Sequence, residues 1–111
     1  MTKKEEQSTV PQLSSKQVKY LRGLGHSLSA LVLIGKEGIT DKLIKSANVE
    51  LLNHELIKAK VGTNSSVNKN EAAQILPQAT NSILVQFIGK TLLLYKPNPK
   101  RPKEKRIILP K

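Results

Sequence analysis

Short apolar runs alternate with amphipathic helical stretches along this chain, and this alternation is what most restricts its fold. The run at 30–34 is continuous, apolar and partly β-branched, which is typical of a strand buried on both faces. Residues 56–61 alternate apolar side chains with lysine, which predicts a strand with one wet face. Two further β-rich runs, 82–88 and 91–95, are separated by a Gly-Lys pair, and this spacing predicts an antiparallel hairpin.

Three helical segments lie between or before these strands. Serines at 14–15 can cap the first helix, Thr40 can cap the second, and an Asn-x-x-Glu capping box at Asn68 starts the third. Pro77 is expected to kink the third helix or end it early. The order α-β-α-β-α-β-β predicts an α/β fold with one mixed sheet packed with helices. Whether residues 106–109 add a short edge strand is open.

The chain of 111 residues corresponds to one ordinary domain with polar ends. Residues 1–12 are polar and show no periodicity, so we expect a flexible N-terminal arm. The domain then covers residues 13–96. Residues 97–111 are rich in proline and basic side chains, and we expect them to form a tail that serves either as a solubilising extension or as a nucleic-acid arm.

Basic side chains outnumber acidic ones by 19 to 8, which gives a net charge of +11. Such an excess attracts polyanions, and nucleic acid is the default partner. The chain has no cysteine, which excludes disulfide scaffolds, cysteine-ligated metals and thiol catalysis. No apolar run is long enough to span a membrane, and the N-terminus has acids where a secretory signal needs apolar residues. We therefore expect a soluble cytoplasmic protein that does not associate with membranes.

Catalysis finds little support in the sequence. His26 and His54 lack the spacing of metal ligands, and the carboxylates outside the polar ends form no recognisable acid–base pair. We therefore expect no enzymatic activity, no metal and no cofactor. A small basic ribonuclease stays open as an alternative, because lysine, histidine and glutamate can suffice for RNA cleavage.

The few aromatic residues limit how nucleic acid could be bound. Of Tyr20, Phe87 and Tyr95, the last two lie in predicted strands, where core packing is the more common use. Modules that stack bases on a sheet need two or three exposed aromatic side chains. Contacts to phosphate and sugar should therefore dominate, so binding would follow shape and charge rather than base sequence.

The sharpest local motif is the loop Gly35-Lys36-Glu37-Gly38. Its glycines can adopt positive φ and leave no Cβ between the backbone and a ligand, and the loop leads directly into a helix whose N–H groups and dipole favour an anion. These features suit a clamp on a sugar–phosphate backbone. The alternative, that the glycines simply turn a strand into a helix, stays open.

Other candidate contacts are basic residues and their neighbours on the first two helices, in the hairpin turn and in the tail. The stripe on the first helix contains no acid, which favours a binding face over a merely solvated one. The complete set is Lys16, Lys19, Arg22, His26, Lys42, Lys45, Gly89, Lys90, Thr91, Lys96, Lys100 and Arg101.

Taken in order, several motifs resemble the CRM domain family in its free-standing bacterial, YhbY-like form. The resemblance runs from Leu13 to Pro110. The motifs that carry it are LSSKQ (13–17), RGLGH (22–26), VLIGKEGIT (32–40), HELIK (54–58) and GKTLLLYK (89–96).

The resemblance implies a four-stranded mixed sheet related to the C-terminal domain of translation initiation factor 3. It also implies RNA binding through the Gly-x-x-Gly loop and the adjacent basic surface. We expect no small-molecule substrate. Free-standing bacterial members associate with precursors of the large ribosomal subunit, whereas plant organellar members promote group II intron splicing. We therefore expect a monomer that binds ribosomal RNA and assists large-subunit assembly.

Two other interpretations of the same residues stay open. The run 33–39 also looks like the core of a KH domain, in which the glycine loop joins two helices; here a predicted strand precedes it. A permanent ribosomal protein, with a structural role, is the second alternative.

Overall fold

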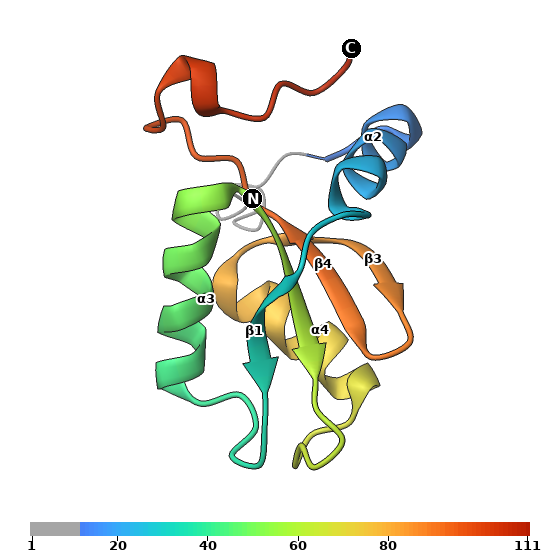
Figure 1. The fold of residues 1–111 in the computed structure, drawn as a ribbon, viewed down its shortest axis with the longest axis vertical. Helices are drawn as coiled ribbons and strands as arrows, with labels where there is room; N and C mark the ends of the chain where they lie inside the picture. The colour runs from blue at the N-terminus through green and yellow to red at the C-terminus, as the bar shows by residue number, and fades with distance from the viewer. Residues whose placement is uncertain (1–11) are drawn as a thin grey trace, which may run out of the picture.

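The computed structural model describes residues 12–111, so the flexible arm expected over residues 1–12 lies outside the described residues except for Gln12. The elements follow the predicted order, and a short 3₁₀ helix comes after them (Figure 1). They are α2 (Ser15–Gly25), β1 (Ala30–Ile34), α3 (Asp41–His54), β2 (Leu56–Val61), α4 (Lys69–Thr80), β3 (Ile83–Ile88), β4 (Thr91–Tyr95) and η1 (Lys103–Lys105).

The start of each α-helix is fixed by the capping residue that the sequence indicates. The Ser14 hydroxyl accepts a hydrogen bond from the backbone N–H of Gln17 at 3.1 Å, and the Gln17 side chain accepts one from the Ser14 N–H at 3.0 Å. Asn68 and Glu71 form the same reciprocal box at the start of α4. At α3 the Thr40 hydroxyl accepts from the N–H of Leu43 at 3.1 Å. These caps satisfy N–H groups that the helices themselves leave unpaired.

Pro77 does not end α4 early. The helix continues from Pro77 to Thr80, and the Thr80 hydroxyl donates to the carbonyl of Leu76 at 2.8 Å. Proline removes one backbone hydrogen bond, but the buried face of the helix, with Ala72 and Leu76 before it and Thr80 after it, continues past this position. Burial of that face therefore outweighs the missing hydrogen bond.

The sheet has four strands in the order β1-β2-β4-β3. β1 and β2 are parallel and connected through α3, whereas β2 with β4 and β3 with β4 are antiparallel. This is the mixed four-stranded sheet that the family resemblance implies. The loops after β1 and β2 and the β3–β4 turn lie at one end of the sheet, and the C-terminal segment lies at the other (Figure 1).

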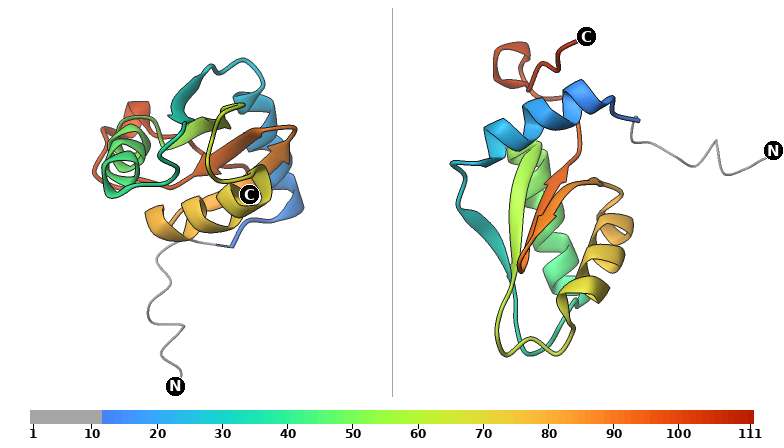
Figure 2. Two further views of the ribbon diagram at one scale, coloured as in Figure 1. Left: turned by 90° about the horizontal axis from the view of Figure 1, so that it is seen from below. Right: turned by 90° about the vertical axis from the view of Figure 1, so that its right-hand side faces the viewer.

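The two faces of the sheet are covered unequally. Helices α3 and α4 pack along the whole of one face, whereas α2 crosses only one end of the other (Figure 2). The first core cluster lies between the sheet and the helices α3 and α4, and the second lies beneath α2 and the C-terminal segment. The buried members of the first are Val32, Ile34, Ala47, Leu51, Ile57, Ala59, Val61, Ala72, Leu76, Leu92 and Leu94; those of the second are Leu21, Leu56, Val85, Leu93 and Tyr95.

The prediction that β1 is buried on both faces is wrong. Val32 and Ile34 are buried, but Leu31 is 47% exposed and Leu33 is 65% exposed. β1 is an edge strand, and the side chain of Leu33 points to the face that α2 leaves bare. An apolar run alone does not distinguish a central strand from such an edge strand.

The C-terminal segment, which we expected to be a tail, packs against the domain through a buried carboxylate. Glu55 lies between α3 and β2 with a φ of 65° and is fully buried. One of its carboxylate oxygens accepts from the Asn98 N–H at 2.8 Å. The other accepts from the Arg101 guanidinium at 3.0 Å and from the Ile107 N–H at 2.8 Å. Residues 106–109 form no strand; Ile107 and Leu109 instead pack against the second cluster.

Both strand aromatics serve packing, as the sequence suggested. Phe87 packs against the first cluster, and Tyr95 is buried in the second. Burial raises the pKa of the Tyr95 hydroxyl; the negative charge of Glu55 raises the pKa further, and Arg106 lowers it in part. Tyr95 therefore remains a neutral packing residue at physiological pH.

The Glu55 arrangement predicts a large loss of stability for Glu55→Ala. The substitution leaves the Arg101 guanidinium, with a side chain only 18% exposed, and two backbone N–H groups without their acceptor. Removing one partner of such a buried pair costs about 3–5 kcal/mol. Urea unfolding measures the loss, with the exposed Glu104→Ala as the matched control. A Glu55→Ala variant as stable as the control would contradict this role.

Candidate nucleic-acid interface

Most of the candidate residues from the sequence fall on three surfaces. The first, the glycine-loop surface, consists of residues 35–38 and Lys42 beside them. The second, the basic groove, lies between α2 and the bare half of the sheet, which is the part of that sheet face that α2 does not cover. The third is the C-terminal end of the molecule, at the opposite end of the sheet from the glycine loop (Figure 1).

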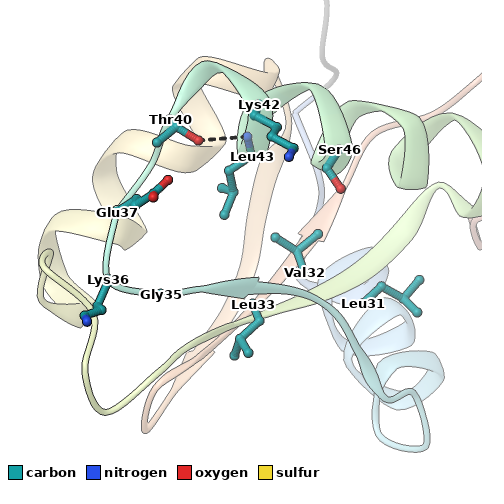
Figure 3. Close-up of a pocket in the computed structure, with 11 residues that line it drawn as sticks. Leu31, Val32, Leu33, Gly35, Lys36, Glu37, Thr40, Lys42, Leu43 and Ser46 are labelled. Carbon is teal, nitrogen blue, oxygen red and sulfur yellow. Dashed lines mark hydrogen bonds between the residues drawn. The ribbon is translucent and has the colours of Figure 1, made fainter.

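The glycine loop is a tight turn between β1 and α3. The Gly38 N–H donates to the Gly35 carbonyl at 3.0 Å, and Lys36 and Glu37 are exposed at the corner of the turn. The turn lies at one end of a cleft that is lined on one side by β1 and on the other by the first turns of α3 (Figure 3). Because a strand rather than a helix precedes the loop, the arrangement is not that of a KH domain.

The two glycines have different roles, and the expectation of positive φ is confirmed only for Gly38. Its φ is 73°, and a Cβ there would lie 2.8 Å from the Ser66 hydroxyl oxygen. Gly35 does not have a positive φ, and a Cβ there would meet no atom within 4 Å. The fold therefore needs glycine at Gly38 and not at Gly35, which faces open space that another molecule can enter.

The charge at the glycine loop is balanced rather than positive. Lys36 and Lys42 are offset by Glu37 and by Asp41, the first residue of α3. The Thr40 side chain already accepts from a free N–H of that helix (Figure 3). The start of α3 is thus less suited to bind a phosphate than the sequence suggested, because an acid and a cap occupy it.

The basic groove has the opposite character. Its wall is the exposed face of α2, with Lys19, Arg22 and His26 as expected from the stripe. Its floor is the sheet, where Lys58 of β2 contributes a further cation. Within residues 12–111 no acidic side chain lines this groove, so its cations are not neutralised locally. The complete lining is Lys19, Arg22, Gly23, His26, Lys58, Gln86, Ile88, Thr91 and Leu93.

The hairpin turn connects the groove to the end of the sheet that carries the glycine loop. The Val61 N–H donates to the Lys90 carbonyl at 2.8 Å, and the Gly62 N–H donates to the Ile34 carbonyl at 2.9 Å. Gly89 has a φ of 60°, as its place in a tight turn requires. Gly89 and Lys90 are exposed at this end, and Thr91 lines the groove itself.

The candidates at the C-terminal end line neither the basic groove nor the cleft beside the glycine loop, and three of them form hydrogen bonds within the fold. Arg101 pairs with Glu55, and the Lys96 ammonium donates to the Thr80 carbonyl at 3.0 Å. Lys16 lies at the start of α2, where its ammonium is 3.5 Å from the Lys111 carbonyl, and Lys100 is exposed.

Lys45 lies on α3 one turn after Lys42 and is exposed.

Sequence reasoning missed Lys58 and Gln86 as candidates. The alternation of lysine with apolar residues in β2 was a usable signal, because it places Lys58 and Lys60 on one face. Gln86 carried a weaker signal as the single polar residue within β3. The register of β3 shifts between Leu84 and Gln86, so simple alternation does not place Gln86 on its face.

Neither a metal centre nor a membrane-spanning helix is found within residues 12–111. In that range, no three side chains of the metal-ligating types His, Asp and Glu come together. None of the helices there is long and apolar enough to cross a membrane.

The glycine geometry predicts different stabilities for two matched variants. Gly38→Ala should destabilise the fold by about 1–2 kcal/mol, because alanine is strained at positive φ, and the close approach to Ser66 adds to this. Gly35→Ala should change stability by no more than about 0.5 kcal/mol. Urea unfolding of both variants checks the difference, and equal losses would contradict it. Gly35→Ala is therefore the variant in which weaker nucleic-acid binding would report on the loop rather than on folding.

Comparison with known proteins agrees with this architecture. Residues 13–96 match the model of the CRS1 / YhbY (CRM) domain. The Bacillus subtilis protein YqeI, named as a probable RNA-binding protein, is 40% identical over 84 residues, which cover 76% of this chain and 88% of that protein. A Haemophilus influenzae protein named RNA-binding protein is 35% identical over 99 residues, covering 89% of this chain and 96% of that protein.

A solved structure also matches. The solution structure of a hypothetical Staphylococcus aureus protein, described as a candidate for RNA binding, superposes with a TM-score of 0.71 at 42% sequence identity. The match covers 89% of this chain and all of that one. The family resemblance drawn from the motifs and the predicted α/β fold are thereby confirmed.

Proposed function

This chain belongs to the CRS1 / YhbY (CRM) domain family, and from that premise we propose that it is a non-enzymatic RNA-binding protein that assists assembly of the large ribosomal subunit. It binds structured ribosomal RNA in precursors of that subunit and acts as a cytoplasmic monomer. The names of the relatives support RNA as the partner. The family resemblance in the sequence motifs supports the ribosomal role.

The observation that carries the proposal is the uncompensated charge of the basic groove. Lys19, Arg22 and Lys58 line a surface that no acid of the described chain shares. An uncompensated groove of this kind concentrates positive potential where a phosphate backbone can enter. The two lysines of the glycine-loop surface are offset by Glu37 and by the adjoining Asp41, so this surface contributes close backbone approach at Gly35 rather than net attraction.

The groove also suggests how RNA is held. Phe87 and Tyr95 are used in packing, and Tyr20, 41% exposed, is the one aromatic side chain available on the described surface. Stacking of successive bases therefore has no platform, and binding rests on interactions with phosphate and sugar. Such interactions fix the register of a folded RNA and stabilise it without reading its sequence, which suits a factor that promotes assembly.

Two sets of three substitutions with equal charge change test this assignment. Lys19→Gln, Arg22→Gln and Lys58→Gln together should weaken binding to structured RNA and lower its salt slope by about 0.7–0.9 for each phosphate that the variant no longer neutralises. The control set, Lys100→Gln, Lys103→Gln and Lys105→Gln, removes exposed cations at the far end and should change the slope much less. Equal effects would mean that RNA is attracted by overall charge. Substitution is preferable to truncation, because cutting off residues 97–111 leaves Glu55 without its partners.

The ribosomal role predicts a particular distribution in cell lysates. The protein should sediment with precursors of the large subunit at low magnesium and be scarce on translating ribosomes. Fractions of a sucrose gradient probed for the protein check this. The groove variant should leave the precursor peak, and the control set should remain in it.

The same experiments separate the alternatives. Stoichiometric presence on mature ribosomes would favour a permanent ribosomal protein with a structural role. Cleavage of RNA by the purified chain, abolished in His26→Ala, would favour a small basic ribonuclease. Binding carried by Lys36 and Gly35 alone, without the groove, would favour a KH-like use of the glycine loop.

A further inference from the structure

Four side chains form a straight row across the bare half of the sheet. Leu33 of β1 pairs with Lys60 of β2, Lys60 with Thr91 of β4, and Thr91 with Ile88 of β3. Residues paired in register point to the same face of a sheet. The two ends of the row are strongly exposed, Leu33 at 65% and Ile88 at 63%.

A second, parallel row lies between the first row and α2. Lys58 of β2 pairs with Leu93 of β4, which pairs with Gln86 of β3. Leu93 is buried beneath α2, so the groups that this row offers to solvent are an ammonium and an amide. Together the two rows make a shallow surface of two lysines, one amide and one hydroxyl between two aliphatic side chains.

The amide of Gln86 and the hydroxyl of Thr91 have no role within the fold. Both side chains are partly exposed in the basic groove, and neither has a hydrogen-bonding partner within the described chain. By contrast, the polar side chains of Ser14, Thr40, Asn68 and Thr80 cap helices or bond within the fold. Each free group can both donate and accept a hydrogen bond, which suits a hydroxyl as its partner.

The shape of this surface selects among the grooves of nucleic acids. With strands about 4.8 Å apart, a row across four strands spans about 14 Å. The minor groove of B-form DNA is about 6 Å wide, and its major groove, although about 12 Å wide, is about 8.5 Å deep, so a shallow surface reaches the base edges of neither. The minor groove of A-form RNA is wide and shallow and displays 2′-hydroxyl groups, whereas its major groove is too narrow for side chains to read.

We propose that the bare half-sheet docks on the minor groove of double-stranded RNA, where Thr91 and Gln86 bond to ribose 2′-hydroxyls and so select RNA over DNA. This inference rests on the proposed RNA-binding function and names its substrate class. Lys58 and Lys60 reach the phosphates beside the groove, and Leu33 and Ile88 cover the apolar faces of the riboses. Lys19 and Arg22 on α2 hold the adjoining strand of the duplex.

Binding to matched duplexes tests the proposal. A short RNA duplex and a DNA duplex of the same sequence are titrated with the wild-type chain at one fixed salt concentration, and fluorescence anisotropy reports binding. The test variant combines Thr91→Val with Gln86→Met, which keep the shape and charge of the surface. The control is Gln78→Met, exposed on α4 on the other side of the molecule. Thermal melts confirm that all of the chains are folded.

The wild-type chain should bind the RNA duplex more tightly than the DNA duplex. The double variant should lose about threefold to tenfold in RNA affinity for each hydrogen bond removed, at unchanged DNA affinity. The control should retain the full preference. Replacing the ribose 2′-hydroxyls of the RNA duplex by 2′-fluoro groups, which keep the A-form, should weaken binding by the wild-type chain and have little effect on binding by the double variant.

Each of the other outcomes overturns this inference, and one of them also overturns the proposed function. A wild-type chain that binds RNA but does not prefer the RNA duplex overturns this inference and leaves RNA binding in place. The same holds if the double variant keeps the wild-type preference, or if single-stranded RNA binds more tightly than the duplex. No binding to any RNA would overturn the proposed function itself, and this inference with it.

Discussion

The arrangement of this molecule depends on the hydrogen bonds and the ion pair that the buried carboxylate of Glu55 forms. It lies where α3 ends and β2 begins, and it collects three hydrogen-bond donors from the segment after β4. An ionised carboxylate without such partners could not be buried at this depth. Because the donors come from residues 98–107, the carboxylate holds the C-terminal segment beside α2. There Ile107 and Leu109 complete the core beneath that helix.

This arrangement decides which part of the sheet is left for function. The helices α3 and α4 cover one face completely, and α2 with the C-terminal segment covers only the Glu55 end of the other. The uncovered half keeps Lys58 and Lys60 in contact with solvent, and α2 adds its own cations along the border. The residues that stabilise the fold and the residues of the candidate interface thus lie at different ends of the same face of the sheet. Substitutions in the groove therefore need not disturb the core.

Much of this architecture could be predicted from the sequence because the signals are local. Ser14, Thr40 and Asn68 cap their helices through hydrogen bonds to residues three positions away, and the Gly-Lys pair sets the hairpin. The features that could not be predicted depend on distant partners. Nothing near Glu55 in the sequence indicates that Arg101 is its partner, and nothing near residues 30–34 indicates that β1 lies at an edge.

The residues of the candidate site also divide into those that a local sequence pattern predicts and those that depend on distant partners. The basic face of α2, with Lys16, Lys19, Arg22 and His26, was evident from helical periodicity. The structure keeps the last three on one wall of the groove, whereas the ammonium of Lys16 lies beside the Lys111 carbonyl. Lys58 and Gln86 join it only through strand pairing, which brings residues far apart in the chain onto the same face. Arg101 was a plausible RNA-binding residue by composition alone, but its long side chain turns inward to Glu55.

The open edge of β1 gives the high net charge a second physical role. A short, apolar strand without charge or proline presents unpaired backbone groups along its free side, and Leu31 and Leu33 are exposed beside them. Such an edge can pair with the same edge of another copy and start aggregation. At a net charge of +11 two copies repel one another, so the charge that attracts a polyanion also keeps the free protein in solution. Colloidal stability of the purified chain is therefore tied to ionic strength, because salt screens the repulsion that keeps these edges apart.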